Sequence, residues 1–230
     1  MPLRYRAPVG QLSLFSADVA SPTLEDLGGL LAAHGQITRS SHGCRLSILL
    51  TQQWRAAALQ REFERRGLGS SISAGQDGTG QDGTGQDDTG QDGIERADAD
   101  RSDSQPSANI LLRSDRSAAL DPLADAWTRG SAKTVPAFPV AAGGLLRCWV
   151  LAAGRSDELG FLLGTDPHAA QTYPRLAAGL AGIGVTGAVI GGRGGGPGVR
   201  IVGKRRLDRL AELLGAAPAD APDGTFPTGR

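Results

Sequence analysis

Cysteine, aromatic residues and long apolar runs are all scarce in this chain. It has two cysteines, Cys44 and Cys148, and aromatic residues make up 4% of it. Two isolated cysteines supply neither a disulfide framework nor the paired spacing of a zinc site, so we expect reduced, partly buried thiols. No apolar run approaches the ~20 residues that span a membrane, and residues 1–10 lack an apolar signal core. The sequence therefore predicts a cytoplasmic, globular protein without membrane association.

Lysine is also scarce, because Lys133 and Lys204 are the only two and arginine supplies nearly all of the positive charge. The formal net charge of zero hides an uneven distribution. Residues 76–103 hold nine of the 24 acidic residues and two of the 24 basic ones, which leaves 22 basic and 15 acidic residues elsewhere. A basic body weakly favours an anionic partner such as nucleic acid, although a GC-rich genome would also enrich arginine.

The acidic segment is a five-residue repeat, QDGTGQDGTGQDDTGQDG, at 76–93. It has no large apolar residue, so burial cannot offset the entropy of ordering, and we predict that 74–107 is a disordered insertion in a surface loop. Its Asp-Gly spacing fits neither an EF-hand nor a nine-residue calcium repeat, so calcium binding is not expected.

Outside the insertion, apolar periodicity and glycine stops predict one order of elements that occurs twice. The first copy has the order helix (21–35), strand (36–40), strand (44–51), helix (52–68), strand (70–74), strand (108–114) and helix (117–130). The second copy has the order helix (144–154), strand (161–165), helix (168–184), strand (185–192), strand (198–204) and helix (205–215), and one of its strands is undefined in the sequence. The predicted parts are an N-terminal extension (1–20), a first half (21–116), a second half (117–215) and a flexible tail (216–230).

The stretch LGGLLAAHG at 27–35 places Gly28 and Gly29 inside a predicted helix. Glycine in a helix interior costs about 1 kcal/mol relative to alanine, so the pair favours close approach of another backbone. The stretch LRCWVLAAG at 146–154 holds the same place in the second half. We therefore predict that these two helices pack together at a pseudo-twofold axis, with ordinary core packing as the alternative.

These segments resemble the LAGLIDADG homing endonucleases in their single-chain, two-motif form. Residues 27–35 follow the motif nearly position by position, whereas 146–154 match at their ends and in hydrophobicity. A Lys-x-x-Pro, here Lys133–Pro136, precedes the second motif helix as in the family, but Trp149 is followed by VLAAG rather than by an Asp-Gly ending. The resemblance covers roughly 24–215 outside the insertion. It implies an α/β fold, α+β in layout, of two αββαββα halves whose saddle-shaped antiparallel sheets lie in the major groove of double-stranded DNA, in a monomer.

The chain departs from the family at its catalytic positions. In the family each motif helix presents an acid just before its last glycine, and the two carboxylates hold divalent metal at the scissile phosphates. Here these positions are His34 and Ala153. Magnesium prefers oxygen ligands, so imidazole is a poor substitute and alanine offers no ligand. The resemblance therefore implies a catalytically inactive DNA-binding protein, with no metal site and no cofactor expected.

Two alternatives stay open at this point. An active endonuclease would need Mg²⁺ held by displaced acids, for which Asp157 and Glu158 on the following loop are the candidates. A protein-interaction module that kept the scaffold and lost DNA affinity is the other. GIGVTG at 182–187 has the reverse of the strand–helix order of a dinucleotide site, and GGRGGGPG at 191–198 lacks the Lys-Ser/Thr of a P-loop.

If DNA binding survives, basic residues of the strands and hairpins are expected to carry it, because guanidinium suits both guanine readout and phosphate contact. The candidates are Arg39, Arg45, Arg113, Lys133, Arg193, Arg200 and Lys204. The strands nevertheless lack the dense polar and basic alternation of a specific major-groove reader.

Overall fold

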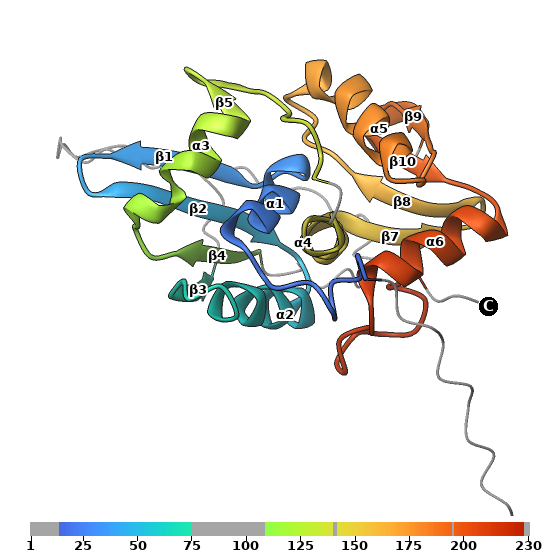
Figure 1. Ribbon diagram of the computed structural model, residues 1–230, viewed down its shortest axis with the longest axis horizontal. Coiled ribbons are helices and arrows are strands. Elements are labelled where there is room, and N and C mark those ends of the chain that lie inside the picture. The colour runs from blue at the N-terminus through green and yellow to red at the C-terminus, as the bar shows by residue number, and fades with distance from the viewer. Residues whose placement is uncertain (1–13, 75–108, 140–141, 195, 228–230) are drawn as a thin grey trace, which may run out of the picture.

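The computed structural model describes residues 14–74, 109–139, 142–194 and 196–227 (Figure 1). The predicted insertion, 74–107, lies outside these residues except for Ala74. No helix in the described part of the chain is both long and apolar enough to cross a membrane.

The first half of the fold starts with a short 3₁₀ turn and ends with a helix over its own sheet. Its elements are η1 (Leu24–Leu27), α1 (Gly28–Ala32), β1 (Gln36–Ser40), β2 (Gly43–Leu50), α2 (Gln53–Glu64), β3 (Ser70–Ala74), β4 (Ile110–Ser114), η2 (Ala118–Leu120) and α3 (Asp121–Trp127). Helix α3 contacts β1 and β2, so it covers the first sheet.

The second half follows a small hairpin. The hairpin strands are β5 (Thr128–Arg129) and β6 (Ala132–Lys133). The remaining elements are α4 (Gly143–Ala153), β7 (Gly154–Asp157), β8 (Gly160–Gly164), η3 (Ala170–Thr172), α5 (Tyr173–Gly182), β9 (Ala188–Ile190), η4 (Gly192–Gly194), β10 (Gly198–Ile201) and α6 (Lys204–Leu214).

The two halves share one sheet topology. Within the described residues, one four-stranded sheet has the order β1-β2-β4-β3 and the other has the order β7-β8-β10-β9. All of their strand pairs are antiparallel. The order of elements thus repeats as the sequence predicts, and the structure adds that the strand order repeats too. A twofold axis relating the halves stays a prediction.

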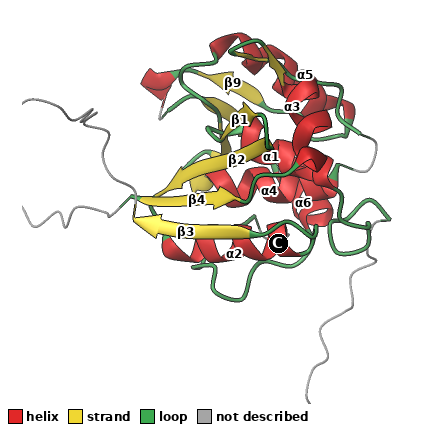
Figure 2. Cartoon of the chain, turned by 90° about the vertical axis from the view of Figure 1, so that its left-hand side faces the viewer, coloured by secondary structure: helices red, strands yellow, loops and turns green. Residues whose placement is uncertain are grey.

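Helices α1 and α4 pack against each other between the two sheets (Figure 1). A Cβ added to Gly29 would overlap the carbonyl oxygen of Leu145 and would lie 2.6 Å from the backbone nitrogen of Trp149. Gly28 is also tight, but against a side chain, because its Cβ would lie 2.6 Å from Nε1 of Trp127 in α3. The close approach predicted from the Gly-Gly pair is therefore confirmed. Figure 2 shows that the helices α1, α3, α4 and α6 gather on one side of the strands.

A buried ion cluster joins the C-terminal end of α2 to η1 and to α4. Glu62 Oε2 accepts a hydrogen bond from Arg66 Nη1 at 2.7 Å, and its Oε1 accepts one from Arg147 Nε at 2.8 Å. Arg66 also pairs with Asp26 at 2.8 Å, and its side chain is only 2% exposed. Two carboxylates and two guanidinium groups thus satisfy one another inside the protein.

Both cysteines are free and buried, as expected. Burial raises the pKa of the Cys44 thiol to about 11, with Asp121 adding to the effect. Burial likewise raises the pKa of Cys148 to about 12. Burial therefore favours the neutral thiol at both positions, and a neutral thiol is a poor nucleophile and metal ligand.

Two predicted helices are shorter than the sequence pattern indicated. The segment 21–35 forms η1 and then a five-residue α1, because Thr23 begins the turn with a capping box and Ala33 leaves the helical region. The segment 168–184 forms the 3₁₀ turn η3 and becomes α-helical only at Tyr173, where Pro174 takes a first-turn position that needs no amide hydrogen.

Two segments expected to be irregular are ordered by tertiary contacts. The residues after Gly154 were expected to form a loop, but they are β7, because their backbone pairs with β8 from Gly154↔Leu163 to Asp157↔Gly160. The tail was expected to be frayed, but Asp220 pairs with Arg61 at 2.7 Å and the ring of Phe226 is buried beside Arg147.

Candidate nucleic-acid interface

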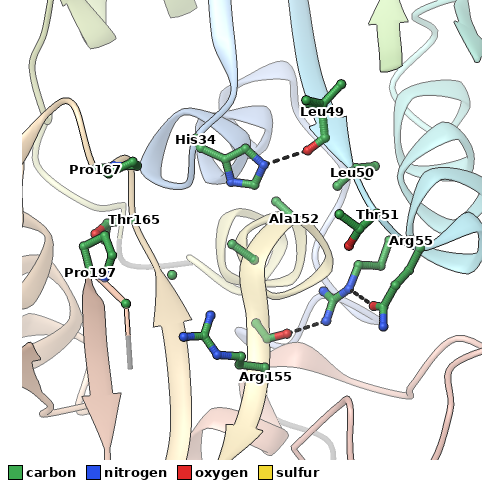
Figure 3. A pocket seen from close by; sticks show the side chains of 15 residues that line it. His34, Leu49, Leu50, Thr51, Arg55, Ala152, Arg155, Thr165, Pro167 and Pro197 are labelled. Atoms are coloured by element: carbon green, nitrogen blue, oxygen red, sulfur yellow. Dashed lines mark hydrogen bonds between the residues drawn. The ribbon is translucent and has the colours of Figure 1, made fainter. Parts of the chain in front are cut away.

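The C-terminal ends of α1 and α4 open onto one cavity of about 380 Å³. His34 follows α1 and Ala153 ends α4, and both line this cavity (Figure 3). The fold therefore brings together the two positions at which the sequence resemblance places catalytic acids. Among the described lining residues the formally charged side chains are Arg55 and Arg155, and no aspartate or glutamate is present.

Arg55 closes the C-terminal end of α4 from the neighbouring helix α2. Its Nη1 donates to the carbonyl oxygens of Val150 and Leu151, each at 2.9 Å, and its Nη2 donates to the carbonyl of Gly154. The side chain of Gln52 fixes the guanidinium from the other side, at 2.6 Å from Nε. The last carbonyls of a helix lack partners within the helix and carry partial negative charge, so a buried cation is stabilised there.

Lys133 closes the end of α1 in a similar way. Its Nζ lies 3.3 Å from the carbonyl oxygens of Leu31 and Ala33 and 2.7 Å from Oδ2 of Asp166. Burial lowers the pKa of the Lys133 amine although Asp166 opposes the shift. Burial acts to raise the pKa of Asp166, but the hydrogen bond from Lys133 and other donors outweighs it and the pKa is lowered. A phosphate contact by Lys133 would require this buried pair to open.

His34 is held by one backbone contact. Its Nε2 lies 2.7 Å from the carbonyl oxygen of Leu49 in β2, and since a carbonyl only accepts, Nε2 is the donor. The imidazole is therefore held against the C-terminal end of β2 and lines the cavity (Figure 3). Nothing in this geometry makes it a general base aimed at a reacting group.

The displaced acids do not reach the cavity at the helix ends. Asp157 and Glu158 line a separate cavity together with residues of α6. Asp157 is paired with Arg200 at 2.8 Å, and hydrogen bonds from Arg200 and the backbone lower its pKa against the opposing effect of burial. Among the described residues, no group of three or more His, Cys, Asp and Glu side chains is placed to hold a metal ion. The residues at the helix ends therefore do not fit the divalent metal that the resemblance implies.

The first sheet has one face covered by helices and one open face. In β2, Cys44, Leu46, Ile48 and Leu50 are buried, whereas Arg45, Ser47 and Leu49 between them are not. Cross-strand register places Thr38 beside Arg45, and places Arg113 between Ser47 and Ser71. Because alternate side chains of a strand point to opposite faces, these residues share the open face. Within the described residues neither Arg45 nor Arg113 forms an ion pair.

The other predicted contacts lie in different surroundings. Arg39 is in register with Cys44, hence on the helix-covered face, and pairs with Asp125 of α3 at 2.7 Å. Arg193 is exposed on η4. Lys204 pairs with Asp208 along α6. Arg200 is in register with the buried Leu162 of the second sheet and pairs with Asp157 at 2.8 Å. Of the predicted DNA contacts, Arg45 and Arg113 thus lie on one face of the first sheet, and the remaining ones lie elsewhere on the molecule.

Comparison with known proteins assigns the architecture. The chain is similar to the solved structure of the homing endonuclease I-WcaI bound to its DNA recognition sequence, with a TM-score of 0.52, over 87% of this chain and 84% of that one. The chain has a homing-endonuclease fold. The two sequences are 10% identical, so the similarity establishes the fold and not the activity. No family model and no curated protein sequence matches the chain.

Sequence reasoning missed three charged residues around the helix ends: Arg55, Arg155 and Asp166. Arg55 is in a stretch rich in alanine and arginine, QQWRAAALQREFERR, which is typical of an exposed helix face. Arg155 belongs to a strand that lacks β-branched and aromatic residues, so the sequence did not indicate that it lies in a sheet. Asp166 follows β8, and only the fold places it beside Lys133.

Proposed function

We propose that this protein binds double-stranded DNA through the open faces of its sheets and does not cleave it by the two-carboxylate, metal-dependent route of the LAGLIDADG homing endonucleases. The observation that carries the proposal is the cavity at the ends of α1 and α4. It lies at the two positions where the family resemblance places the catalytic acids, and the formally charged side chains among its described lining residues are arginines.

The open face of the first sheet supports the DNA-binding part of the proposal. Arg45 and Arg113 lie there among hydroxyl side chains, and no carboxylate of the described residues pairs with them, which suits contact with phosphates and base edges. The related fold of I-WcaI was solved with its DNA recognition sequence, which gives a precedent for this partner.

The first test is fluorescence anisotropy on a random-sequence duplex at 50 and 200 mM salt with magnesium, followed by a gel of the same DNA. Two or more phosphate contacts would weaken binding by about tenfold or more over this range, because each contact releases a condensed counter-ion. We expect salt-sensitive binding and intact DNA. Metal-dependent cleavage would refute the inactive state, and the variant D157A/E158A would then show whether these acids supply it.

An absence of binding at low salt would refute the DNA-binding proposal itself. The protein-interaction module would then be the better explanation for a scaffold that is retained without nuclease acids. Binding of DNA that weakens with salt as described above supports DNA binding over the protein-interaction module, and the test needs no knowledge of a partner protein.

The variant R45A/R113A is expected to weaken duplex binding by about tenfold or more. The slope of log affinity against log salt is expected to fall by about 0.9 for each phosphate that the variant no longer neutralises. The matched control is Arg209→Ala, since Arg209 is on the opposite, helical side of the molecule and pairs with Glu212. Equal affinities for the double variant and the control would show that the first sheet does not face DNA. Circular dichroism checks that both variants are folded.

A further inference from the structure

The two sheets can be compared position by position, because they share one strand order. Arg113 is the last residue but one of β4, and Arg200 is the last but one of β10. Strand β4 lies between β2 and β3, as β10 lies between β8 and β9. The neighbours in register with these two arginines are Ser47 and Ser71 in the first sheet and Leu162 and Ala188 in the second. Two hydroxyl groups of the first sheet are therefore replaced by apolar side chains in the second.

The two equivalent arginines also differ in their availability to a ligand. Arg113 is exposed and forms no ion pair within the described residues. The side chain of Arg200 is only 16% exposed, and its Nε and Nη2 lie 2.9 and 2.8 Å from Oδ2 of Asp157. Leu162, beside Arg200 in register, is fully buried. The first sheet therefore presents an exposed guanidinium between hydroxyl groups, whereas the second presents an ion pair beside a buried leucine.

A second arginine of the first sheet has no counterpart in the second. Arg45 lies two residues before Ser47 on β2, and it forms no ion pair within the described part of the chain. The position two residues before Leu162 on β8 is Gly160. A Cβ added to Gly160 would overlap the carbonyl oxygen of Ile201, so the second sheet has no room for an arginine there.

The spacing of the two arginines in the first sheet matches that of base pairs in a duplex. Arg113 is directly opposite Ser47, so Arg45 is its diagonal neighbour on the same face of the sheet. Diagonal neighbours in an antiparallel sheet are about 7–8 Å apart. Successive nucleotides of one strand are about 3.4 Å apart along the duplex axis. The two guanidinium groups would therefore meet base pairs about two steps apart.

We propose that this protein recognises DNA sequence with its first sheet only, where Arg45 and Arg113 each bind one guanine in the major groove. The second sheet contacts the other half of the site without distinguishing its bases. This inference rests on the proposed DNA binding and assigns its sequence specificity. Arginine donates two hydrogen bonds to O6 and N7 of guanine, and the serines beside Arg113 add hydroxyl groups that bind base edges.

Selection from a randomised duplex library tests where the sequence is recognised. Duplexes bound by the full chain are recovered over several rounds and sequenced, and the protected region is mapped with a nuclease. We expect guanine at two positions about two base pairs apart, both on one side of the centre of the protected region. No base preference is expected on the other side. Preferences of equal strength on both sides would overturn the proposal.

Matched variants then assign each preference to a residue. Arg113→Gln is compared with Arg45→Gln and with Arg200→Gln, the equivalent variant of the second sheet. Affinity is measured at constant ionic strength on the selected duplex and on duplexes in which one guanine is replaced by adenine. The wild type is expected to prefer guanine by about tenfold or more at each position. We expect R113Q to lose this ratio at one position and R45Q to lose it at the other.

The control R200Q is expected to keep the ratio at both positions, with any loss of affinity falling equally on the two duplexes. General loss of charge or of stability changes the affinities but does not change the ratio. Circular dichroism checks that each variant is folded. A loss of guanine preference in R200Q, or in Arg155→Gln on the same sheet, would show that the second sheet recognises bases and would overturn the assignment.

Replacing each selected guanine by 7-deazaguanine alters the DNA rather than the protein. This base lacks the N7 acceptor, so it removes one of the two hydrogen bonds to arginine. The replacement is expected to weaken wild-type binding at both positions, and to have no further effect in R113Q at the position that this variant no longer recognises. A further loss there would mean that another residue binds this guanine, which contradicts the role of Arg113.

Failure of this inference is distinct from failure of the proposed function. Salt-sensitive binding with a selected pool as random as the starting library would refute sequence recognition by the first sheet, and the DNA-binding proposal would stand. An absence of binding to the library at low salt would refute the DNA-binding proposal, and sequence recognition with it.

Discussion

Replacing Glu62 by glutamine is expected to lower the free energy of unfolding by about 3 kcal/mol, because removal of one partner from a buried ion pair leaves uncompensated charge inside the protein. Glu62 is 3% exposed and accepts from both Arg66 and Arg147. Arg66 keeps its second partner, Asp26, and Arg147 keeps the carbonyls of Leu214 and Ala216. The expected decrease in the free energy of unfolding is therefore at the lower end of the range for broken buried ion pairs. Urea denaturation of the variant and the wild type measures this decrease.

The control for Glu62→Gln is Glu212→Gln, which breaks an exposed pair with Arg209. Surface pairs contribute about 0–1 kcal/mol, so this variant is expected to unfold close to the wild type. A loss below about 1 kcal/mol for Glu62→Gln would mean that the cluster relaxes or admits water, and that it contributes little to holding α2 against α4.

The same carboxylate gives stability a defined pH dependence. Burial acts to raise the pKa of Glu62, but the hydrogen bonds from Arg66 and Arg147 outweigh it and hold the pKa below the ordinary value of 4.5. A group whose pKa is lowered on folding stabilises the folded state above its unfolded pKa, and that contribution is lost as the pH falls. The stability difference between wild type and Glu62→Gln is therefore expected to shrink below about pH 4.5. A difference that grows on acidification would contradict this assignment.

Replacing Gly29 by alanine is expected to cost about 3 kcal/mol or more, at or beyond the upper end of ordinary overpacking, because the neighbours of the new methyl group are backbone atoms. The added Cβ would overlap the Leu145 carbonyl and crowd the Trp149 nitrogen, and neither can move without displacing α4. The higher helix propensity of alanine returns only about 1 kcal/mol. A lower Tm and a lower urea midpoint are the expected observations.

Gly182→Ala is the matched control, since Gly182 ends α5 and an added Cβ would meet nothing within 4 Å. This variant is expected to be neutral or slightly stabilising. Equal stability of the Gly29 and Gly182 variants would show that α1 and α4 can separate at little cost, and would remove the physical reason for glycine at position 29.

The sequence predicted those parts of the fold that local chemistry determines. Gly28 and Gly29 indicated a helix pair in close contact, and apolar periodicity and the glycine stops located most other elements. Strand β7 was missed because its residues, Gly-Arg-Ser-Asp, carry no strand preference and become a strand only through pairing with β8. The length of α1 was misjudged because the turn before it is 3₁₀ and the residue after it leaves the helical region.

The residues of the candidate site also fall into those that a local sequence motif indicates and those that only the fold reveals. His34 and Ala153 were placed at the centre of the interface by the motif alone, and the structure puts both at one cavity. Arg39 and Lys133 were chosen as surface cations, but their partners, Asp125 and Asp166, are distant in sequence. No local pattern specifies such pairs, because they depend on which helix crosses which strand. Their roles in DNA binding stay predictions.

The caps on the two central helices also have a consequence for how the molecule can be divided. Arg55 belongs to the first half and caps the C-terminal end of α4, a helix of the second half. Lys133, paired with Asp166, follows the first sheet in the chain and caps the C-terminal end of α1, a helix of the first half. Neither half carries all of the groups that finish its own central helix. The two halves together are therefore the smallest unit expected to unfold cooperatively. A gene fragment that encodes either half alone would produce a central helix with an uncapped C-terminal end and with the apolar face that packs on the other half exposed to water.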